Sequence, residues 1–206
     1  METLRRLNER HPWSHNDHFQ GWILRRLPGR RARALDVGCG RGGLAARLAR
    51  EFSSVDAADS DASMRAATAE RCAGLDVRVI DGFDAAAGSY DVITMIASLH
   101  HLDLDATLRR CHELLAPGGR LLVAGLVRPE SARDYAWFAI CAATNPVIGF
   151  AKHPRPCRGP APAVLFPVRD PDESYAQIRQ TARGLLPGAR MHRRLGFRYT
   201  LEWHRP

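Results

Sequence analysis

The sequence predicts an α/β protein built on a doubly wound, mostly parallel sheet of seven strands that a C-terminal antiparallel hairpin closes. Short apolar runs alternate with helical patterns through the first two thirds of the chain. Such alternation is typical of parallel strands joined by right-handed crossovers. A glycine-rich loop at 38–43 follows the first run directly, as in Rossmann-like folds. Because ligands of such sheets bind beyond the carboxyl ends of the strands, we expect the functional site there.

Apolar patterning predicts five strands and three helices up to residue 126. The strands are expected at 34–37, 54–59, 76–80, 90–96 and 120–126, and the helices at 44–51, 60–73 and 103–115. The fourth and fifth strands are almost continuously apolar, which is typical of strands buried on both faces. Ser60 or Asp61 is the expected N-cap of the second helix, and Pro117-Gly118-Gly119 is expected to end the third.

The pattern changes after residue 126. We expect a helix at 131–143, a proline-rich segment at 153–171, a helix at 172–186 and two strands within 191–203 that meet near Leu195-Gly196. The whole chain, 1–206, is then one domain. It comprises an N-terminal segment (1–31), a ligand-binding core (32–126), a region with helices and a proline-rich lid (127–188) and the closing hairpin (189–206).

Composition sets limits on function. The 206 residues are 45% hydrophobic and 25% charged, as in ordinary globular proteins. The net charge of +8 comes almost wholly from arginine, since Lys152 is the single lysine. A scattered positive charge does not by itself indicate nucleic-acid binding. Five widely spaced cysteines predict neither a disulfide framework nor a zinc ribbon, and no signal peptide or apolar span is evident, so we expect a cytoplasmic protein.

The glycine loop fits two nucleotide-binding patterns. Gly38, Gly40 and Gly43 satisfy G-x-G-x-x-G, the dinucleotide fingerprint. With Gly42 in place of Gly43 and Asp36 before them, the same loop satisfies D-x-G-x-G-x-G. An acid beside the loop suits a cationic ligand group and would repel a pyrophosphate. Asp59 ends the second strand and can accept both hydroxyls of a ribose, which indicates a nucleoside without giving its type.

Four segments in order then resemble one family. ALDVGCGRGGLAARLA, VDAADSDASM, YDVITMIASLHHL and LLAPGGRLLVAGL look like the successive motifs of class I S-adenosylmethionine-dependent methyltransferases over residues 32–126. The C-terminal segment resembles the closing hairpin of small bacterial members. The resemblance implies a methyltransferase that uses S-adenosyl-L-methionine and releases S-adenosyl-L-homocysteine. The aromatic, irregular insert after the fifth strand favours a small-molecule acceptor, plausible in bacterial secondary metabolism, with no membrane and no nucleic acid as partner.

The resemblance also implies roles for individual residues around the cofactor. The methionine end would lie against Asp36, Gly38, Cys39 and Gly40, the ribose against Asp59 and Ser60, the adenine against Asp81, Gly82 and Phe83, and the sulfonium above Met95, Ile96 and Ala97. Phe19, in a helix that precedes the core, would cover the cofactor. The alternative for several of these residues is a structural role as a turn, cap or core residue.

The remaining chemistry concerns the acceptor. His100 and His101 follow the fourth strand and are candidate general bases, with a structural histidine as the alternative for each. Trp13, Tyr135, Trp137 and Phe138 are candidate acceptor-binding residues; the three on the 131–143 helix cannot share one face. His11, His15 and His18 lack a carboxylate pattern, so we expect no metal.

Three other functions remain open. An RNA-modifying methyltransferase is favoured by charge alone. The segment Ala97-Ser98-Leu99-His100 lacks the motif of amino-group DNA methyltransferases. A nicotinamide-dependent oxidoreductase would use the G-x-G-x-x-G match, but Asp36 opposes it and a Tyr-x-x-x-Lys pair is missing from the sequence. A non-catalytic protein that binds the cofactor is the third.

Overall fold

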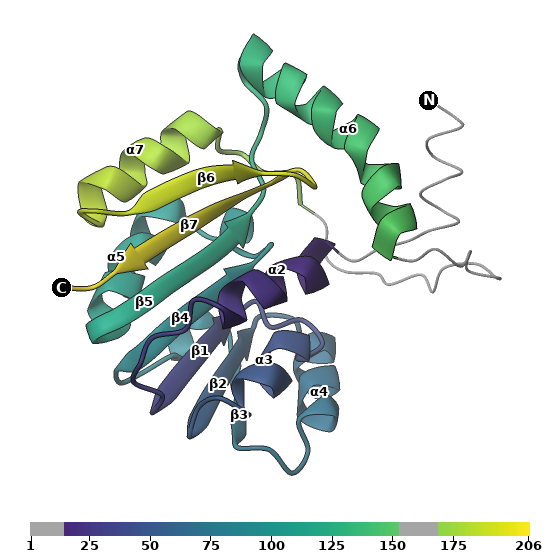
Figure 1. Cartoon of the computed structure of the whole chain (residues 1–206). Helices are drawn as coiled ribbons and strands as arrows, with labels where there is room; N and C mark the ends of the chain where they lie inside the picture. Colours follow the sequence, from purple (N-terminus) through teal and green to yellow (C-terminus); the bar gives the residue numbers. More distant parts are fainter. Residues whose placement is uncertain (1–14, 153–168) are drawn as a thin grey trace.

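The computed structural model describes residues 15–152 and 169–206, and within them it contains a seven-stranded sheet of order β3-β2-β1-β4-β5-β7-β6 (Figure 1). The strands are β1 (Arg33–Val37), β2 (Ser54–Asp59), β3 (Val77–Asp81), β4 (Tyr90–Ile96), β5 (Leu115–Gly125), β6 (Arg190–Arg194) and β7 (Arg198–His204). The first five run parallel, and β7 is antiparallel to both β5 and β6. The predicted fold class and closing hairpin are confirmed.

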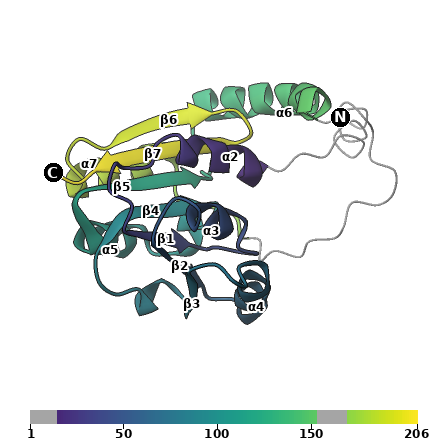
Figure 2. The same cartoon turned by 60° about the horizontal axis from the view of Figure 1, so that its bottom comes forward.

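Helices cover both faces of the sheet, as Figures 1 and 2 show. The described helices are α2 (His15–Leu24), α3 (Gly43–Leu48), α4 (Ala62–Arg71), α5 (Leu104–Leu114), α6 (Ala132–Lys152) and α7 (Tyr175–Leu185). Two short 3-10 turns, η1 (Phe83–Ala85) and η2 (Leu99–His101), follow β3 and β4. Helices α2 and α3 pack on one face, and α5 and α7 pack on the other.

Strand alternation divides the core between these faces. In β1, Leu35 and Val37 pack with the α5–α7 layer, whereas Ala34 packs with the α2–α3 layer. Because neighbouring side chains of a strand point to opposite faces, a strand buried on both sides must be apolar at nearly every position. Strand β4 fulfils this, with its first six residues buried.

A buried acid of β2 ties four strands together. Asp56 of β2 accepts hydrogen bonds from Tyr90 (2.5 Å), Arg78 (2.8 Å) and Arg33 (2.9 Å). These three donors come from β4, β3 and β1. Burial would raise the pKa of Asp56, but the hydrogen bonds from Arg78 and Tyr90 outweigh it and lower this pKa.

Several helices are shorter than predicted, and three element boundaries differ for reasons that the structure shows. Strand β5 begins at Leu115 rather than 120, so Pro117-Gly118-Gly119 lies inside it; the pairing with β4 shifts register there. This irregularity needs glycine, since Gly118 has φ 78° and a Cβ on Gly119 would lie 2.8 Å from the carbonyl of Ala116. The strand is continuous because the glycines form a bulge instead of a loop.

The other two boundaries concern helices. Helix α6 does not end at 143 but continues through Pro146 to Lys152. The side chain of Asn145 is held by His15 of α2 (2.8 Å), a contact from far along the chain that local preference cannot anticipate. Helix α7 begins at Tyr175 rather than 172, because Ser174 and Gln177 form a capping box. Asp61, one of the two predicted caps, is the N-cap of α4.

Candidate active site

The glycine loop turns sharply where β1 and β2 end. Gly38, Gly40 and Gly42 have φ of 72°, 55° and 73°, a region that residues with a side chain rarely adopt. The amide groups of Gly38 and Cys39 donate to the carbonyl of Ala58 at 2.8 and 3.0 Å, which fixes the loop to the end of β2. The close approach also requires glycine, because a Cβ on Gly38 would lie 2.3 Å from the Cβ of Ser98.

Two side chains hold the far side of the loop. Asp59 accepts from the amide of Gly40 (2.9 Å) and, through its other oxygen, from the amide of Asp61 (3.0 Å). The hydroxyl of Thr68, in α4, donates to the carbonyl of Gly40 at 2.8 Å. Thr68 was missed from the sequence, since an isolated threonine in a helix carries no motif. A carboxylate has about four acceptor sites, so Asp59 retains capacity for two further donors.

Asp36 lies beneath this loop within β1. Its side chain is 3% exposed, and the hydroxyl of Thr94 in β4 donates to it at 2.9 Å. Burial raises the pKa of Asp36 to about 7, although the hydrogen bond from Thr94 acts in the opposite direction. No cation pairs with it among the described residues, so its ionised form is poorly compensated.

The backbone is unusual where β4 ends. Ala97 has φ 54°, which is rare for a residue with a Cβ, and its amide donates to the carbonyl of Ala124 in β5 (2.8 Å). The hydroxyl of Ser98 donates to the carbonyl of Val37 in β1 (2.6 Å). These bonds tie the end of β4 to both neighbouring strands. Strained backbone of this kind collects at functional sites, and Ile96 is partly buried beside it.

His100 and His101 lie in η2, directly after this turn, with their ring centroids 4.1 Å apart. Nδ1 of His100 is buried and has no hydrogen-bond partner among the described residues. Burial, reinforced by the charge of His101, lowers the pKa of His100 to about 4. Burial also lowers the pKa of His101. His100 is therefore neutral near pH 7, the form in which a histidine can accept a proton.

The residues predicted to surround the nucleoside occupy different environments. Asp81 ends β3 in register with Asp59, is exposed, and pairs with Arg65 at 2.8 Å. Ser60 is exposed next to Asp59, and Gly82 adopts φ 74°. The strand ends therefore bring the two acids and Ser60 to one edge of the sheet.

Besides Asp36 and Met95, three further predicted cofactor residues are buried. Phe83 is in the core between the sheet and α5. Cys39 packs in the α2–α3 layer with Sγ 3.5 Å from the hydroxyl of Thr68, and burial raises the pKa of its thiol to about 12. Phe19, expected to cover the cofactor, is instead 2% exposed in the same layer. It faces the sheet with Trp22 and Ile23, because these three positions share one face of α2.

The aromatic residues of α6 point in different directions, as their helical spacing predicts. Tyr135 is 61% exposed, whereas the ring of Phe138 contacts Phe197 in the β6–β7 turn with centroids 5.4 Å apart. Trp137 is half-buried, and its indole nitrogen lacks a partner among the described residues. Trp13 lies outside the residues that the structure describes.

Arg198, the first residue of β7, was not singled out from the sequence. Because β7 is antiparallel, its first residues lie beside the carboxyl end of β5, where Gly125 pairs with Tyr199. The guanidinium donates to Oδ1 of Asn16 in α2 at 3.2 Å. Nothing in the sequence distinguishes Arg198 from the chain's many other arginines, because the pairing of β7 with β5 decides which arginine reaches this edge of the sheet.

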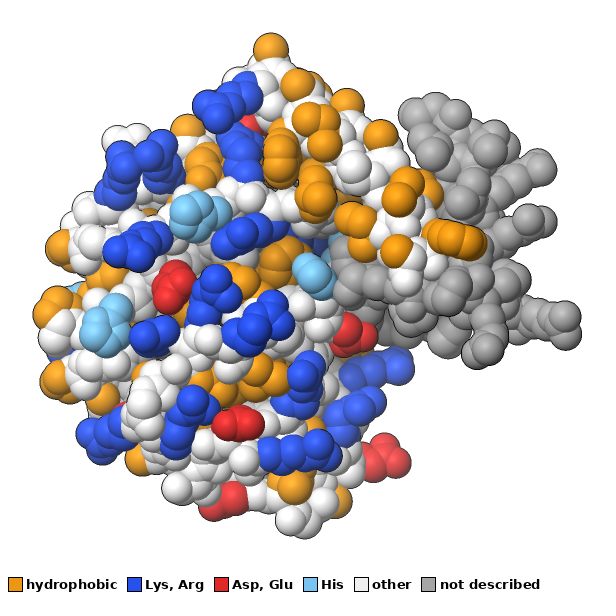
Figure 3. All heavy atoms as spheres, viewed as in Figure 1, with side chains coloured by type: hydrophobic (Ala, Val, Ile, Leu, Met, Phe, Trp, Pro, Cys, Tyr) orange, Lys and Arg blue, Asp and Glu red, His pale blue; other side chains and the backbone are white. Residues whose placement is uncertain are grey.

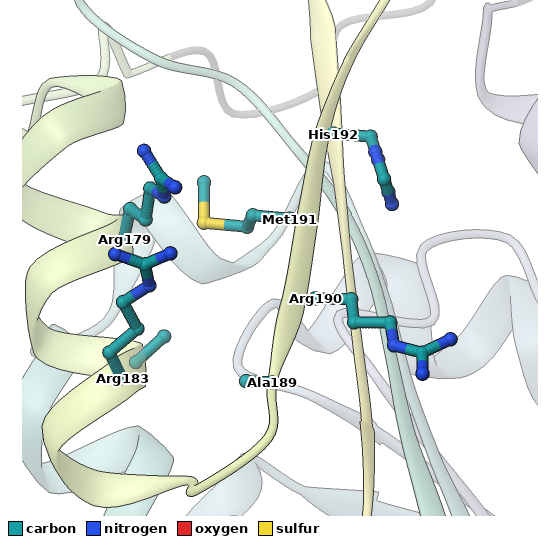
Figure 4. Close-up of a pocket in the computed structure, with 7 residues that line it drawn as sticks. Arg179, Arg183, Ala189, Arg190, Met191 and His192 are labelled. Carbon is teal, nitrogen blue, oxygen red and sulfur yellow. The ribbon is translucent and has the colours of Figure 1, made fainter.

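A cavity of about 220 Å³ lies between α7 and β6, and Figure 4 shows the residues that line it. Arg179 and Arg183 of α7 and Met191 of β6 lie on its helix side, while Arg190 and His192 point to the opposite side of the strand. A second cavity, of about 590 Å³, lies between Arg41 and α4. Neither is lined by the strand-end residues described above, so the candidate site is the edge of the sheet.

The described part of the chain contains neither a cluster of metal-binding side chains nor a helix suited to spanning a membrane. Within residues 15–152 and 169–206, no three His, Cys, Asp or Glu side chains lie close enough to hold a metal ion. His11 of the N-terminal histidine group lies outside these residues. Of the helices in the same ranges, none combines the length and apolarity needed to cross a bilayer.

Comparison with known proteins identifies related sequences. A family model described as a methyltransferase domain matches residues 35–121. An uncharacterized methyltransferase of Mycobacterium tuberculosis is 33% identical over 204 residues, which cover 95% of this chain and 98% of that protein. A ubiquinone biosynthesis O-methyltransferase of Xanthomonas campestris is 40% identical over 114 residues, covering 52% of this chain and 47% of the relative.

Solved structures share the fold. An S-adenosylmethionine-dependent methyltransferase from Aquifex aeolicus aligns with a TM-score of 0.57 at 16% identity, covering 98% of this chain and 97% of that one. A magnesium protoporphyrin IX methyltransferase from Synechocystis, crystallised with S-adenosylmethionine, aligns with a TM-score of 0.56 at 17% identity over 93% and 78%. The fold is the α/β architecture that these methyltransferases share, with the candidate site at the ends of the strands. The chain belongs to the same methyltransferase family as the mycobacterial relative, and its fold is that of class I S-adenosylmethionine-dependent methyltransferases.

Proposed function

We propose that this methyltransferase binds S-adenosyl-L-methionine at the glycine loop and transfers its methyl group to a small-molecule acceptor. One observation carries the proposal: three left-handed glycines form a loop at the ends of β1 and β2, and Asp59 braces it while keeping free acceptor capacity. The electron-poor methyl on sulfur is the chemistry that the cofactor supplies when bound. S-adenosyl-L-homocysteine is then the product.

The residues present fit such a ligand. Asp59 accepts the ribose hydroxyls with its remaining lone pairs, and Ser60 lies beside it. Asp81 accepts from the adenine amino group if Arg65 leaves one of its oxygens free. Asp36 is a buried acid in need of a positive partner, which the ammonium and sulfonium groups supply. Gly38, Cys39 and Gly40 line the methionine end.

The protein's part in the transfer is mainly positioning. The tethered end of β4, Ile96 to Ser98, fixes the floor beneath the reacting methyl group. An in-line displacement gains most from such fixed placement. Neutral His100 or His101 accepts a proton from the acceptor where one must leave. Tyr135, Trp137 and Phe138 of α6 are the candidate residues for binding the acceptor, and a contribution of Trp13 stays a prediction.

Two features support a small acceptor. The curated relative from Xanthomonas is a ubiquinone biosynthesis O-methyltransferase, and a neighbour with the same fold methylates magnesium protoporphyrin IX. The helix-rich segment after β5 adds aromatic side chains to the acceptor side. An acceptor from bacterial secondary metabolism stays a prediction, and neighbouring genes would narrow it.

Calorimetry with S-adenosylmethionine tests the proposal. We expect one site per chain, with Asp59→Ala weakening the affinity by about tenfold or more, because charge-assisted hydrogen bonds to the ribose are lost. Asp76→Ala, an exposed acid before β3, is the control and should bind as the wild type does. A wild-type protein that shows no heat with S-adenosylmethionine or S-adenosylhomocysteine would overturn the proposal.

A further inference from the structure

Arg198 lies at the same edge of the sheet as the candidate bases. It begins β7, next to the carboxyl end of β5, and its charge lowers the pKa of both His100 and His15. His100 follows β4 and His15 begins α2. Arg198 therefore faces the region bounded by β4, β5 and the start of α2, which the proposed function gives to the acceptor.

The environment of this arginine is incomplete. Arg198 donates to the neutral side chain of Asn16, while its Nε is buried without a hydrogen-bond partner in the described structure. No carboxylate within the described ranges pairs with it, and burial alone lowers the pKa of its guanidinium to about 10. A buried charge without a partner is costly, so such groups are normally paired.

Other arginines of the hairpin region do have partners. Arg193, in β6, pairs with the buried Asp134 at 2.5 Å. Arg120 and Arg26 both pair with Glu202 of β7, at 3.6 and 3.3 Å. Arg198 differs from them because it is partly buried at the candidate site, with its Nε fully buried and no acid paired with it in the described structure. The missing partner is therefore an anion that the protein chain does not supply among its described residues.

We propose that Arg198 binds a carboxylate of the acceptor, so that the enzyme methylates an anionic, carboxylate-bearing small molecule; this inference rests on the proposed function. A guanidinium presents a planar fork of donors that matches a carboxylate. Phe197 precedes Arg198 in the chain, and its ring lies 5.4 Å from that of Phe138 and 6.5 Å from that of His15. An aromatic carboxylic acid would therefore match both the guanidinium and the nearby aromatic rings.

The cofactor carries a carboxylate too, but its place differs. The glycine loop follows β1, and two strands, β4 and β5, lie between β1 and β7. At about 4.8 Å per strand, three steps separate Arg198 from the loop by roughly 14 Å. The methionine end of the cofactor lies at the loop in the proposed function, which leaves Arg198 to the acceptor.

The test uses benzoate as the probe, with methyl benzoate and benzamide as neutral analogues of the same shape. Calorimetry or ligand-observed NMR follows binding to the full-length protein saturated with S-adenosylhomocysteine. We expect benzoate to bind and both neutral analogues to bind at least tenfold more weakly. Arg198→Met should lower benzoate affinity by about tenfold or more, as expected for loss of a charged hydrogen-bonded pair. Arg198→Lys should retain part of it.

Matched controls separate this proposal from the proposed function. Arg190→Met removes an exposed arginine of the same hairpin and should leave benzoate binding unchanged. All variants should bind S-adenosylmethionine within about twofold of the wild type, which also confirms their folding. If the wild type binds S-adenosylmethionine but not benzoate or a panel of other small carboxylates, the inference is wrong.

Two further outcomes are also decisive. If Arg198→Met and Arg198→Lys both lose affinity for S-adenosylmethionine while remaining folded by circular dichroism, Arg198 holds the cofactor's carboxylate, and the inference is overturned. If no S-adenosylmethionine binds to the wild type, the proposed function fails instead. The benzoate titration repeated without cofactor then still decides whether Arg198 is an anion site.

Discussion

Individual residues at the candidate site are fixed mainly by backbone contacts. Asp59 accepts from the amide of Gly40, Thr68 donates to its carbonyl, and Ser98 ties the end of β4 to β1. Each bond joins a short polar side chain to the backbone of the glycine loop or of the strand that precedes it. This arrangement organises the loop before any ligand arrives, so ligand binding costs less ordering.

Gly40→Ala should abolish measurable S-adenosylmethionine binding, because a Cβ strains the loop at φ 55° and enters the space beside the ligand. Gly74→Ala is the matched control: Gly74 also has positive φ, 80°, but its Cβ would meet only open space in a distant turn. Calorimetry and thermal unfolding of both variants separate the two causes. An equal loss of affinity in both variants would show that backbone strain, and not obstruction of the ligand at the glycine loop, is responsible.

Asp36 should make cofactor affinity depend on pH. Its folded pKa, about 7, lies above the usual value of 3.8, so the free protein loses stability as pH rises from about 4 to 7. A cationic ligand favours the ionised form. Affinity for S-adenosylmethionine should therefore fall below pH 7, by at most about tenfold per pH unit, with proton release on binding. Titrations in buffers of different ionisation enthalpy measure both.

Asp36→Asn provides the comparison for that dependence. The amide keeps the shape and can still accept from Thr94, but it does not titrate. Its binding should be weaker at pH 8 and nearly flat with pH. A wild-type profile as flat as that of the variant would contradict a direct role for the Asp36 charge.

At the scale of elements, α6 is held chiefly at its two ends. At its start, Ser131 and Asp134 form a capping box, with Asp134 accepting from the amide of Ser131 (3.0 Å) and Ser131 Oγ accepting from the amide of Asp134 (3.2 Å). Arg193 of β6 pairs with the same carboxylate. Further along, Asn145 meets His15. Figure 3 shows hydrophobic side chains gathered over α6. The exposed ones are Tyr135, Ile140, Val147 and Phe150.

Asp134→Ala should therefore loosen α6 without unfolding the sheet. Loss of the cap alone costs about 1 kcal/mol, and Arg193 loses its partner as well. Hydrogen exchange of the α6 amides should accelerate, while that of β4 and β5 stays slow. Arg133→Ala, an exposed neighbour, is the control and should exchange as the wild type does. Faster exchange throughout the sheet would contradict a local role.

Asp134 also makes the stability of the folded protein depend on pH. Burial would raise the pKa of Asp134, but hydrogen bonds from Ser131, Glu130 and Arg193 lower it to about 2. Its stabilising contribution is thus complete above the unfolded value near 4 and is lost as pH falls through 2. At neutral pH the cap is fully formed.

On the whole molecule, stability and binding occupy different regions. Tyr90 begins β4, whereas the candidate site lies where β4 ends.

Arginines on the face seen in Figure 3 are interspersed with acids and spread over several elements. The charge of +8 therefore forms no single uninterrupted basic track on this face.

Tyr90→Phe should destabilise the entire sheet while leaving the site intact. The tyrosine is fully buried, and its hydroxyl donates to Asp56, which links four strands. Removing one donor from a buried carboxylate costs about 1–3 kcal/mol. Urea unfolding should show this loss, with unchanged affinity for S-adenosylmethionine. Tyr135→Phe, exposed on α6, should change neither; a loss of cofactor affinity in Tyr90→Phe would show that the two regions are coupled.

Most of the fold was predictable because its signals are local. Alternating and continuous apolar runs follow from which face of a strand is buried, and glycines at positive φ follow from the local turn. Each of these signals can be recognised within a short stretch of sequence. The loop at 38–43 and the acids at 59 and 81 follow strands whose parallel order brings their carboxyl ends to one edge. A distant contact accompanies one error: α6 continues past residue 143, with His15 on Asn145. The starts of β5 and α7 were misplaced for local reasons, a glycine bulge and a capping box.

The sequence by itself determined the strands, the glycine loop and the family, because each depends on spacing along the chain. Only the tertiary structure decided which polar side chains meet. Thr68 reaches Gly40 because α4 packs beside the loop, and Phe19 is buried because α2 lies on the sheet. Arg198 reaches the candidate site because β7 runs antiparallel to β5. Pairing between strands remote in sequence is set by the packing of the whole core, and no local pattern encodes it.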